Sequence, residues 1–286
     1  MPDDTPRTTP AAPPPHDDPS QHQPRGRGLG RRPGLKDLPI NRMIPNMLTL
    51  LAVCAGLTGI RFAMEGKWEP AAVAILIAAV LDGLDGRVAR ILKGASKFGA
   101  ELDSLSDFVC FGVAPAMILY LWSLNGAGKF GWTLVLLFAI CMGLRLARFN
   151  TALEDANKPT WTKNYFSGVP APAGAGLVLL PMILSFQVGD TFLRRPEVTS
   201  VVLLVVAGLL VSAIPTFSFK KVNVPQPLIL PVMLFAGAAV AGLLSATWAT
   251  LSAILIVYLA TIPLSVRSYR RLYKRDQAAA KKAGPA

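Results

Sequence analysis

Four aspartates lie close together in one stretch of this 286-residue chain that is otherwise mostly apolar. The stretch runs LDGLDGRVARILKGASKFGAELDSLSDFVCFGVAP, from Leu81 to Pro115, and its aspartates are Asp82, Asp85, Asp103 and Asp107. The sequence on both sides, AAVAILIAAV before it and FVCFGVAPAMILYLW at its end, is typical of helices that cross a lipid bilayer. Ionisable side chains are costly at membrane depth, so they indicate a functional site.

The spacing of these aspartates predicts that they converge. Positions i, i+3, i+4 and i+7 share one face of a helix, which places Asp82 with Asp85 and Asp103 with Asp107. The short link Lys93–Lys97 allows the two helices to pack antiparallel. Clustered carboxylates cannot all stay ionised unless a cation compensates them. Such oxygen-rich sites suit Mg²⁺ or Mn²⁺, and the alternative is a set of helix-end aspartates solvated at the membrane surface.

The composition indicates a polytopic membrane protein. Hydrophobic residues make up 52% of the chain and charged residues only 16%, which does not suit a soluble domain. The net charge of +12 could suggest a nucleic-acid partner. The basic residues flank apolar spans, however, so we expect anionic lipid headgroups and no nucleic acid. Both histidines, His16 and His22, precede the first span, which leaves carboxylates as the metal ligands and bases within the membrane.

We predict an all-α fold, a membrane helix bundle with about eight transmembrane helices. The predicted spans are Ile44–Ala63, Pro70–Leu92, Phe98–Leu124, Phe130–Phe149, Val169–Val188, Val198–Pro215, Pro227–Leu244 and Thr247–Val266. Residues 1–38 are rich in proline and arginine and are predicted to be a disordered tail. Residues 39–266 form the predicted transmembrane domain, and 267–286 a basic C-terminal tail. The segment LKDLPINRM, 35–43, is either a short interfacial helix or a plain linker.

The basic residues also predict an orientation. They gather in both tails and in the loops on the same side of the membrane, whereas the opposite loops hold only Lys67, Lys129, Arg194 and Arg195. By the positive-inside rule, both termini and the link between the aspartate pairs are cytoplasmic. We therefore expect a multi-pass protein of the inner (cytoplasmic) membrane, whose aspartates face a cavity near the cytoplasmic half.

The aspartate stretch follows one continuous pattern, D-x2-D-G-x2-A-R-x8-G-x3-D-x3-D, from Asp82 to Asp107. This pattern resembles the signature of the CDP-alcohol phosphatidyltransferases, a family of integral membrane enzymes. In that family, an alcohol attacks the lipid-bearing phosphorus of a CDP-linked lipid, and CMP leaves. The resemblance implies that Asp82, Asp85, Asp103 and Asp107 bind two metal ions. It also implies that Asp107 is the general base that deprotonates the alcohol.

The same resemblance implies four contacts with the CDP-linked lipid. Gly86 would let the nucleotide approach its helix, and Arg90 would bind a diphosphate oxygen. Ser96 and Asn46 are similar to nucleotide-contacting residues of the family. For Arg90 the alternative is an anchor that reaches the membrane surface. For Ser96 and Asn46 it is a helix cap or a packing role.

Three further stretches resemble the phosphatidylserine synthases of this family: LRLARFN (Leu144–Asn150), FSGVPAPAGAG (Phe166–Gly176) and SAIPTFSFKK (Ser212–Lys221). This likeness covers roughly residues 40 to 225. It implies that CDP-diacylglycerol and L-serine are the substrates and, because relatives are dimers, that the protein is a homodimer. Arg145 and Arg148 are candidates for binding the serine carboxylate, with an ordinary basic flank of the span as the alternative.

Other functions remain open from the sequence. The nearest share this chemistry but use glycerol 3-phosphate, inositol phosphate or choline as acceptor. Intramembrane prenyltransferases also use aspartates and Mg²⁺, but their two aspartate motifs are typically far apart in the chain. A divalent-cation transporter would be expected to carry a second carboxylate cluster toward the other membrane face, and the sequence has none.

Overall fold

The computed structural model describes residues 40–92, 94, 96–154, 165–212, 214–217 and 229–283. The chain divides into two units, Met1–Leu38 and Pro39–Ala286, and every described residue belongs to the second. The predicted disordered tail therefore lies outside the described residues. So do Lys93 and Ala95 of the predicted link. Of the predicted interfacial segment, residues from 40 onward form the first turn of a long helix.

The described residues are almost all helical, as predicted. The helices are α1 (Ile40–Met64), α2 (Trp68–Ile91), α3 (Lys97–Asp107), α4 (Ala114–Trp122), α5 (Gly128–Glu154), α6 (Ala171–Val188), α7 (Pro196–Val211), α8 (Ile229–Ser245) and α9 (Thr247–Ala283). A π-helical segment, η3 (Phe108–Val113), joins α3 to α4, and a 3₁₀ turn, η4 (Leu124–Ala127), follows α4. Each of the eight predicted spans overlaps a helix or, in the third span, the continuous run α3–η3–α4. The sixth, Val198–Pro215, was predicted too long, because α7 ends at Val211 and Pro215 belongs to a short strand.

This is a membrane protein built as a helix bundle. Five described helical segments are long and apolar enough to cross a bilayer: Met43–Met64, Lys97–Trp122, Leu124–Thr151, Ala171–Val188 and Thr247–Ser268. The helices α7 and α8 are apolar but shorter, with 16 and 17 residues. α2 has 24 residues, and the aspartates and arginines in its second half lower its hydropathy.

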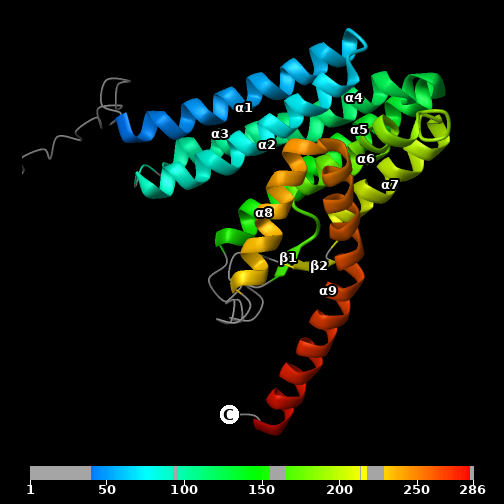
Figure 1. Cartoon of the computed structure of the whole chain (residues 1–286). Helices are drawn as coiled ribbons and strands as arrows, with labels where there is room; N and C mark the ends of the chain where they lie inside the picture. Colours follow the sequence, from blue (N-terminus) through cyan, green and yellow to red (C-terminus); the bar gives the residue numbers. More distant parts are fainter. Residues whose placement is uncertain are drawn as a thin grey trace, which may run out of the picture. The chain divides into compact units, whose positions relative to one another are not determined.

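α1 and α2 form an antiparallel pair that lies side by side in Figure 1. The chain reverses at Gly66, whose φ of 71° favours glycine. Beside it, a hydrogen bond of 2.8 Å from Lys67 holds the pKa of the exposed Glu65 carboxyl below its usual value. Along the pair, a Cβ at Gly59 would lie 3.2 Å from the carbonyl oxygen of Ala71. Small residues thus let the two helices approach closely.

The third predicted span changes its helical geometry immediately after Asp107. The π-helical segment η3 carries Phe111, which is fully buried in the core. It also carries Gly112, where a Cβ would lie 3.0 Å from the side chain of Met142 on α5. Such π turns often mark functional sites. Here the turn changes the helical phase between the aspartates of α3 and the core contacts of α4.

Two short strands, β1 (Tyr165–Ser167) and β2 (Pro215–Phe217), pair antiparallel with Phe166 opposite Thr216. This pairing joins the stretches FSGVPAP and SAIPTF, which are far apart in the sequence. Gly168 follows β1 with a φ of 80°, and its N–H donates to the carbonyl oxygen of Ile214. The prediction contained helices only, because neither strand is long enough to show an alternating pattern.

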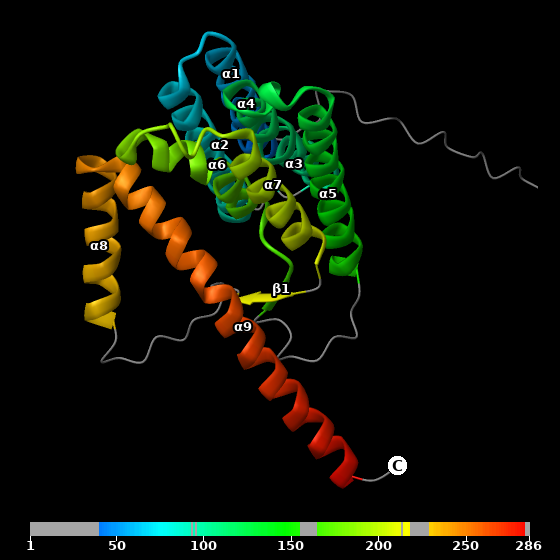
Figure 2. The ribbon, with the colours of Figure 1, turned by 90° about the vertical axis from the view of Figure 1, so that its right-hand side faces the viewer.

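The helices α8 and α9 form a hairpin, and α9 continues well past its partner (Figures 1 and 2). The predicted last span ended at Val266, whereas α9 continues to Ala283 over 37 residues. At 1.5 Å per residue this is about 55 Å, more than the hydrocarbon thickness of about 30 Å. The predicted basic C-terminal tail is therefore largely a helical continuation of the last span.

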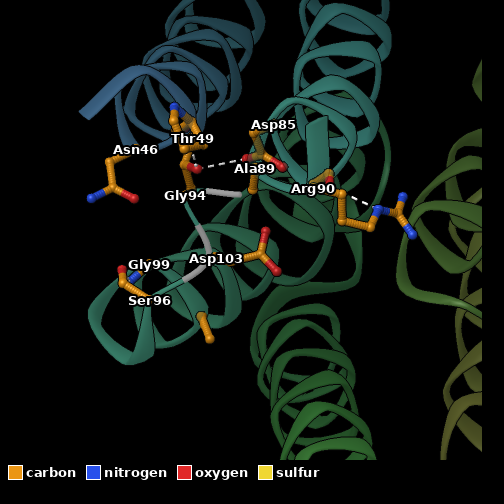
Figure 3. Close-up of a pocket in the computed structure, with 12 residues that line it drawn as sticks. Asn46, Thr49, Asp85, Ala89, Arg90, Gly94, Ser96, Gly99 and Asp103 are labelled. Carbon is orange, nitrogen blue, oxygen red and sulfur yellow. Dashed lines mark hydrogen bonds between the residues drawn. The ribbon is translucent and has the colours of Figure 1, made fainter. Parts of the chain in front are cut away.

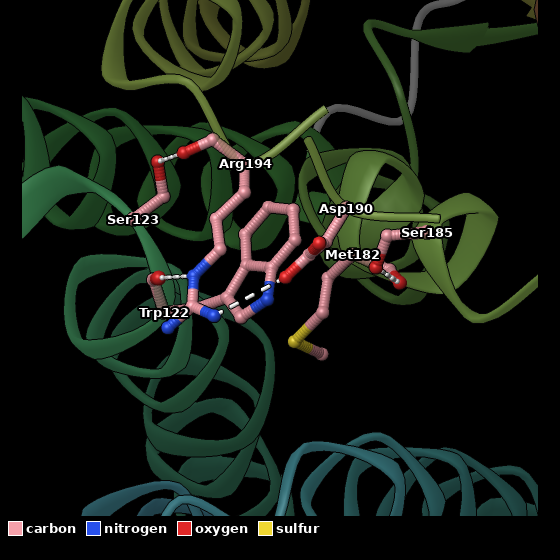
Figure 4. A network of polar contacts seen from close by, with 6 residues as sticks. All are labelled: Trp122, Ser123, Met182, Ser185, Asp190 and Arg194. Atoms are coloured by element: carbon pink, nitrogen blue, oxygen red, sulfur yellow. Dashed lines mark hydrogen bonds and ion pairs between the residues drawn. The ribbon is translucent and has the colours of Figure 1, made fainter. Parts of the chain in front are cut away.

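A polar network connects the end of α4 to the segment just before α7 (Figure 4). Asp103 lies toward the opposite end of the third span. The Arg194 Nε donates to the carbonyl oxygen of Trp122 at 2.9 Å, and its guanidinium pairs with Asp190 at 3.3 Å. The Ser123 hydroxyl donates to the Arg194 carbonyl oxygen at 2.6 Å. These contacts use polar groups that the ends of the helices would otherwise leave unpaired.

Candidate active site

A pocket of about 200 Å³ opens where α1, α2 and the start of α3 meet (Figure 3). The residues that line it are Pro45, Asn46, Thr49, Asp85, Gly86, Ala89, Arg90, Gly94, Ser96, Gly99, Ala100 and Asp103. All four predicted contacts of the CDP-linked lipid are among them. Two of the predicted metal ligands, Asp85 and Asp103, line the same space from facing helices.

The structure brings three of the four aspartates into one group. Asp82, Asp85 and Asp103 each present a carboxylate oxygen within 4.8 Å of the others. Asp107 lies beside this group, with its carboxyl within hydrogen-bonding reach of Asp82. Asp85 is 3% exposed, and it accepts a hydrogen bond of 2.6 Å from the Thr49 hydroxyl on α1. Thr49 thus orients one carboxylate of the group.

The donor set fits a divalent cation. The Oδ1 atom of Asp107 is buried and has no hydrogen-bond partner among the described residues. A buried carboxylate oxygen without a hydrogen-bond partner is costly, and clustered carboxylates repel one another. A cation with a preference for oxygen ligands would remove both costs, and carboxylates are the ligands that Mg²⁺ and Mn²⁺ prefer. The residues present therefore suit a metal-binding site.

Gly86 and Arg90 occupy the wall of the pocket that α2 forms. No atom lies within 4 Å of the position that a Cβ at Gly86 would take, so the backbone there is open to a ligand. The Arg90 Nε donates to the Gly86 carbonyl oxygen at 3.0 Å. In Figure 3 the guanidinium points away from Asp85 and Asp103. Arg90 is exposed, which leaves it accessible to an anionic group at the mouth of the pocket.

Ser96 and Asn46 both lie beside Gly99, in the first turn of α3. The Ser96 hydroxyl caps this helix by accepting a hydrogen bond of 3.0 Å from the Gly99 N–H, so the alternative role as a helix cap is confirmed. A Cβ at Gly99 would lie only 2.9 Å from the Asn46 Oδ1. Glycine at this position therefore lets the first helix approach the third. Both polar side chains also line the pocket.

The two arginines of LRLARFN have different environments. Arg145 is partly buried, donates from Nε to the Val169 carbonyl oxygen at 3.1 Å, and lies over the Phe149 ring. It also lies close enough to Asp107 for the two charges to interact. Arg148 is exposed and donates to the Val211 carbonyl oxygen, at the end of α7, at 3.1 Å. The structure thus brings Arg145 toward the carboxylates described above.

Comparison with protein-family models supports the interpretation of the aspartate pattern. The model of the family described as CDP-alcohol phosphatidyltransferase matches residues 42–266. The chain belongs to this family.

Proteins with similar sequences carry the name CDP-diacylglycerol–serine O-phosphatidyltransferase. The protein of Mycobacterium tuberculosis (strain H37Rv) is 40% identical over 236 residues, which cover 82% of each chain. That of Helicobacter pylori (strain 26695) is 37% identical over 204 residues, 69% of this chain and 82% of the relative. That of Bacillus subtilis (strain 168) is 35% identical over 179 residues, 62% of this chain and 92% of the relative.

Sequence reasoning about this phosphatidyltransferase-family chain missed two residues beside the site. Thr49 lies three residues after Asn46 in the first span, on the same helical face, and that spacing could have identified it. Tyr258 of α9 has a buried hydroxyl oxygen and lies within range of electrostatic interaction with Arg145. No local pattern marks Tyr258, because its proximity to Arg145 arises only from the packing of the last helix.

Proposed function

We propose that this membrane enzyme transfers the phosphatidyl group of CDP-diacylglycerol to the hydroxyl of L-serine, forming phosphatidylserine and CMP. The observation that carries the proposal is the group of three carboxylates within 4.8 Å beside an open pocket. The family match and the names of relatives at 37–40% identity support the choice of substrates. The activity belongs to phospholipid biosynthesis.

The first helices provide the nucleotide and metal side of the site. Asp82, Asp85 and Asp103, together with Asp107, would hold two divalent ions, Mg²⁺ or Mn²⁺, which neutralise the diphosphate oxygens when bound. The residues of the pocket wall then bind the cytidine diphosphate: Asn46, Gly86, Arg90 and Ser96. The open backbone at Gly86 permits close approach, and the Arg90 guanidinium supplies a charge-assisted donor to a phosphate oxygen.

Asp107 acts as the general base. It accepts the proton of the serine hydroxyl through its buried Oδ1, the atom without a hydrogen-bond partner among the described residues. The serine oxygen forms a bond to the phosphorus that bears the diacylglycerol. The bond from that phosphorus to the bridging oxygen of the diphosphate breaks, and CMP leaves with this oxygen. Alignment of the attacking and leaving oxygens is the main task of the protein in such transfers.

Arg145 and Arg148 have separate roles in the acceptor side of the site, the part that binds the alcohol substrate. Arg145 lies near Asp107, so its guanidinium can bind the serine carboxylate while the hydroxyl reaches the base. Arg148 binds the last turn of α7 through Val211 and so holds α5 against α7. The C-terminal end of a helix is a favourable place for such a cation. Arg148 is therefore a positioning residue for the acceptor side.

The protein resides in the inner (cytoplasmic) membrane with both termini in the cytoplasm. The excess of basic residues in the tails and in the loops beside the aspartates supports this orientation. The pocket then opens toward the cytoplasm, where serine is available, while the diacylglycerol of the substrate stays among the membrane lipids. Assembly as a homodimer follows from resemblance to relatives alone.

One assay tests the proposed function. The purified protein in detergent is given CDP-diacylglycerol, a divalent metal and one acceptor at a time, and CMP release is measured. We expect L-serine to give faster release than glycerol 3-phosphate, inositol phosphate or choline at equal concentration. Faster release with one of these three would assign another acceptor within the same chemistry. No CMP release with any acceptor would contradict the phosphatidyltransferase activity itself.

A further inference from the structure

Thr49 connects α1 to the aspartate group. It is 4% exposed, and its hydroxyl lies 2.6 Å from the Oδ2 atom of Asp85 on α2. The same hydroxyl lies 3.0 Å from the carbonyl oxygen of Pro45, one turn earlier on α1. A hydroxyl carries a single proton, so the two oxygens compete for it. The shorter contact has the length of a hydrogen bond to an ionised carboxylate, which makes Asp85 the favoured acceptor.

Polar side chains of the third span hold this part of α1 in place. The hydroxyl of Ser106, a buried residue in the last turn of α3, donates to the Thr49 carbonyl oxygen at 3.4 Å. One turn later, the Cys110 thiol donates to the Ala52 carbonyl oxygen at 3.2 Å. A Cβ at Gly56 would lie 3.1 Å from the Cys110 sulfur, so α1 packs closely against this span. Thr49 therefore contacts α2 through its side chain and α3 through its backbone, and these two helices carry the aspartates.

We propose that Thr49 is a positioning residue for the metal site, whose hydroxyl holds the Asp85 carboxylate in the orientation that binds a divalent ion. This inference rests on the proposed function and extends it to a residue outside the aspartate pattern. Hydrogen-bond partners of metal-ligating side chains fix the orientation of the ligands, and their loss typically lowers metal affinity about 10–100-fold. A carboxylate without this contact can rotate, and ordering it then costs part of the binding free energy.

Thr58 provides a matched control on the same helix. Its hydroxyl donates to the carbonyl oxygen of Cys54 at 2.6 Å, the same contact with the preceding turn that Thr49 makes with Pro45. Thr58 is exposed and does not line the pocket beside the aspartates. Thr58→Val thus removes an equivalent hydroxyl from α1 while leaving the contact with Asp85 in place. The comparison separates a role toward the carboxylate from a role within the helix.

The test measures Mn²⁺ binding in the absence of substrate. The purified protein in detergent is freed of metal with a chelator and titrated with Mn²⁺, and the free ion is followed by its electron paramagnetic resonance signal. We expect Thr49→Val to weaken Mn²⁺ binding about 10–100-fold. Thr49→Ser, which keeps the hydroxyl, and Thr58→Val should bind Mn²⁺ as tightly as the unmodified protein. If Thr49→Val does not fold, Thr49→Ala removes the same hydroxyl with a smaller side chain and should show the same loss.

Four results would contradict parts of this reasoning. Unchanged Mn²⁺ affinity without the Thr49 hydroxyl, or an equal loss in Thr49→Ser or Thr58→Val, would overturn the positioning role while leaving the proposed function intact. Absence of Mn²⁺ binding by the unmodified protein would overturn the positioning role and the metal site together. Absence of CMP release from an unmodified protein that binds Mn²⁺ would overturn the proposed function alone.

Discussion

Replacing Gly86 with alanine tests whether the nucleotide lies against the backbone of α2. In the structure, nothing lies within 4 Å of the added methyl group, so the protein itself can accommodate it. Alanine is also favoured over glycine inside a helix by about 0.8–1 kcal/mol. Gly86→Ala should therefore be folded and at least as stable as the unmodified protein. A loss of activity would then report a clash with the substrate.

The size of the expected loss follows from the cost of overfilling a closely packed site. An extra methyl group in such a site typically costs about 1–3 kcal/mol, and about 1.4 kcal/mol corresponds to a factor of ten. We expect Gly86→Ala to lower kcat/KM for CDP-diacylglycerol about 5- to 150-fold. The KM for serine should change little, because the acceptor side of the site is formed by other helices.

Gly83 provides a matched control on the same helix. A Cβ at Gly83 would also have no atom within 4 Å, and this residue does not line the pocket. Gly83→Ala should keep its activity, while both variants keep or raise their thermal unfolding temperature. CMP release is measured against CDP-diacylglycerol concentration at saturating serine. Equal losses in the two variants, or full activity in Gly86→Ala, would refute the placement of the nucleotide.

Three further predictions concern the metal, the base and the orientation. Chelation should abolish CMP release, and Mg²⁺ or Mn²⁺ should restore it, whereas full turnover in chelator would exclude a metal-dependent site. Asp107→Asn should lower kcat at least about 10²-fold with a smaller effect on donor binding; near-normal turnover would transfer the base role to another residue. In a cysteine-free variant, Ser96→Cys should be labelled from the cytoplasmic side and Gly126→Cys from the other, and the reverse result would invert the proposed orientation.

The parts of the fold that depend on local periodicity could be predicted from the sequence. Long apolar segments predicted the helices, because a helix in lipid satisfies its own backbone hydrogen bonds. The spacing within each aspartate pair and the short link between the pairs predicted that carboxylates from two helices meet. The structure does bring Asp82, Asp85 and Asp103 together. Asp107 lies beside them rather than in the same group, at the point where the helix changes to π geometry.

Features that depend on partners far apart in the sequence could not be predicted. The hydrogen bond from Thr49 to Asp85 spans 36 residues. The spacing from Asn46 places Thr49 on the same helical face, but it does not indicate Asp85 as the partner. The strands β1 and β2 have three residues each, too few for a recognisable alternation. The π segment η3 has the sequence FVCFGV, which resembles that of an ordinary apolar helix and does not mark the change in geometry.

The contrast between local and long-range features also applies to the site, where it separates the proposed transfer chemistry from the proposed choice of acceptor. The carboxylate group and the pocket wall come from α1 to α3, which are consecutive in the chain, so a short motif is enough to identify the chemistry. Arg145 approaches this group from α5, and its Nε donates to the carbonyl oxygen of Val169, two residues before α6 begins. The acceptor-binding part of the site, as proposed, therefore depends on segments far apart in the chain, and for this reason a short motif cannot identify it.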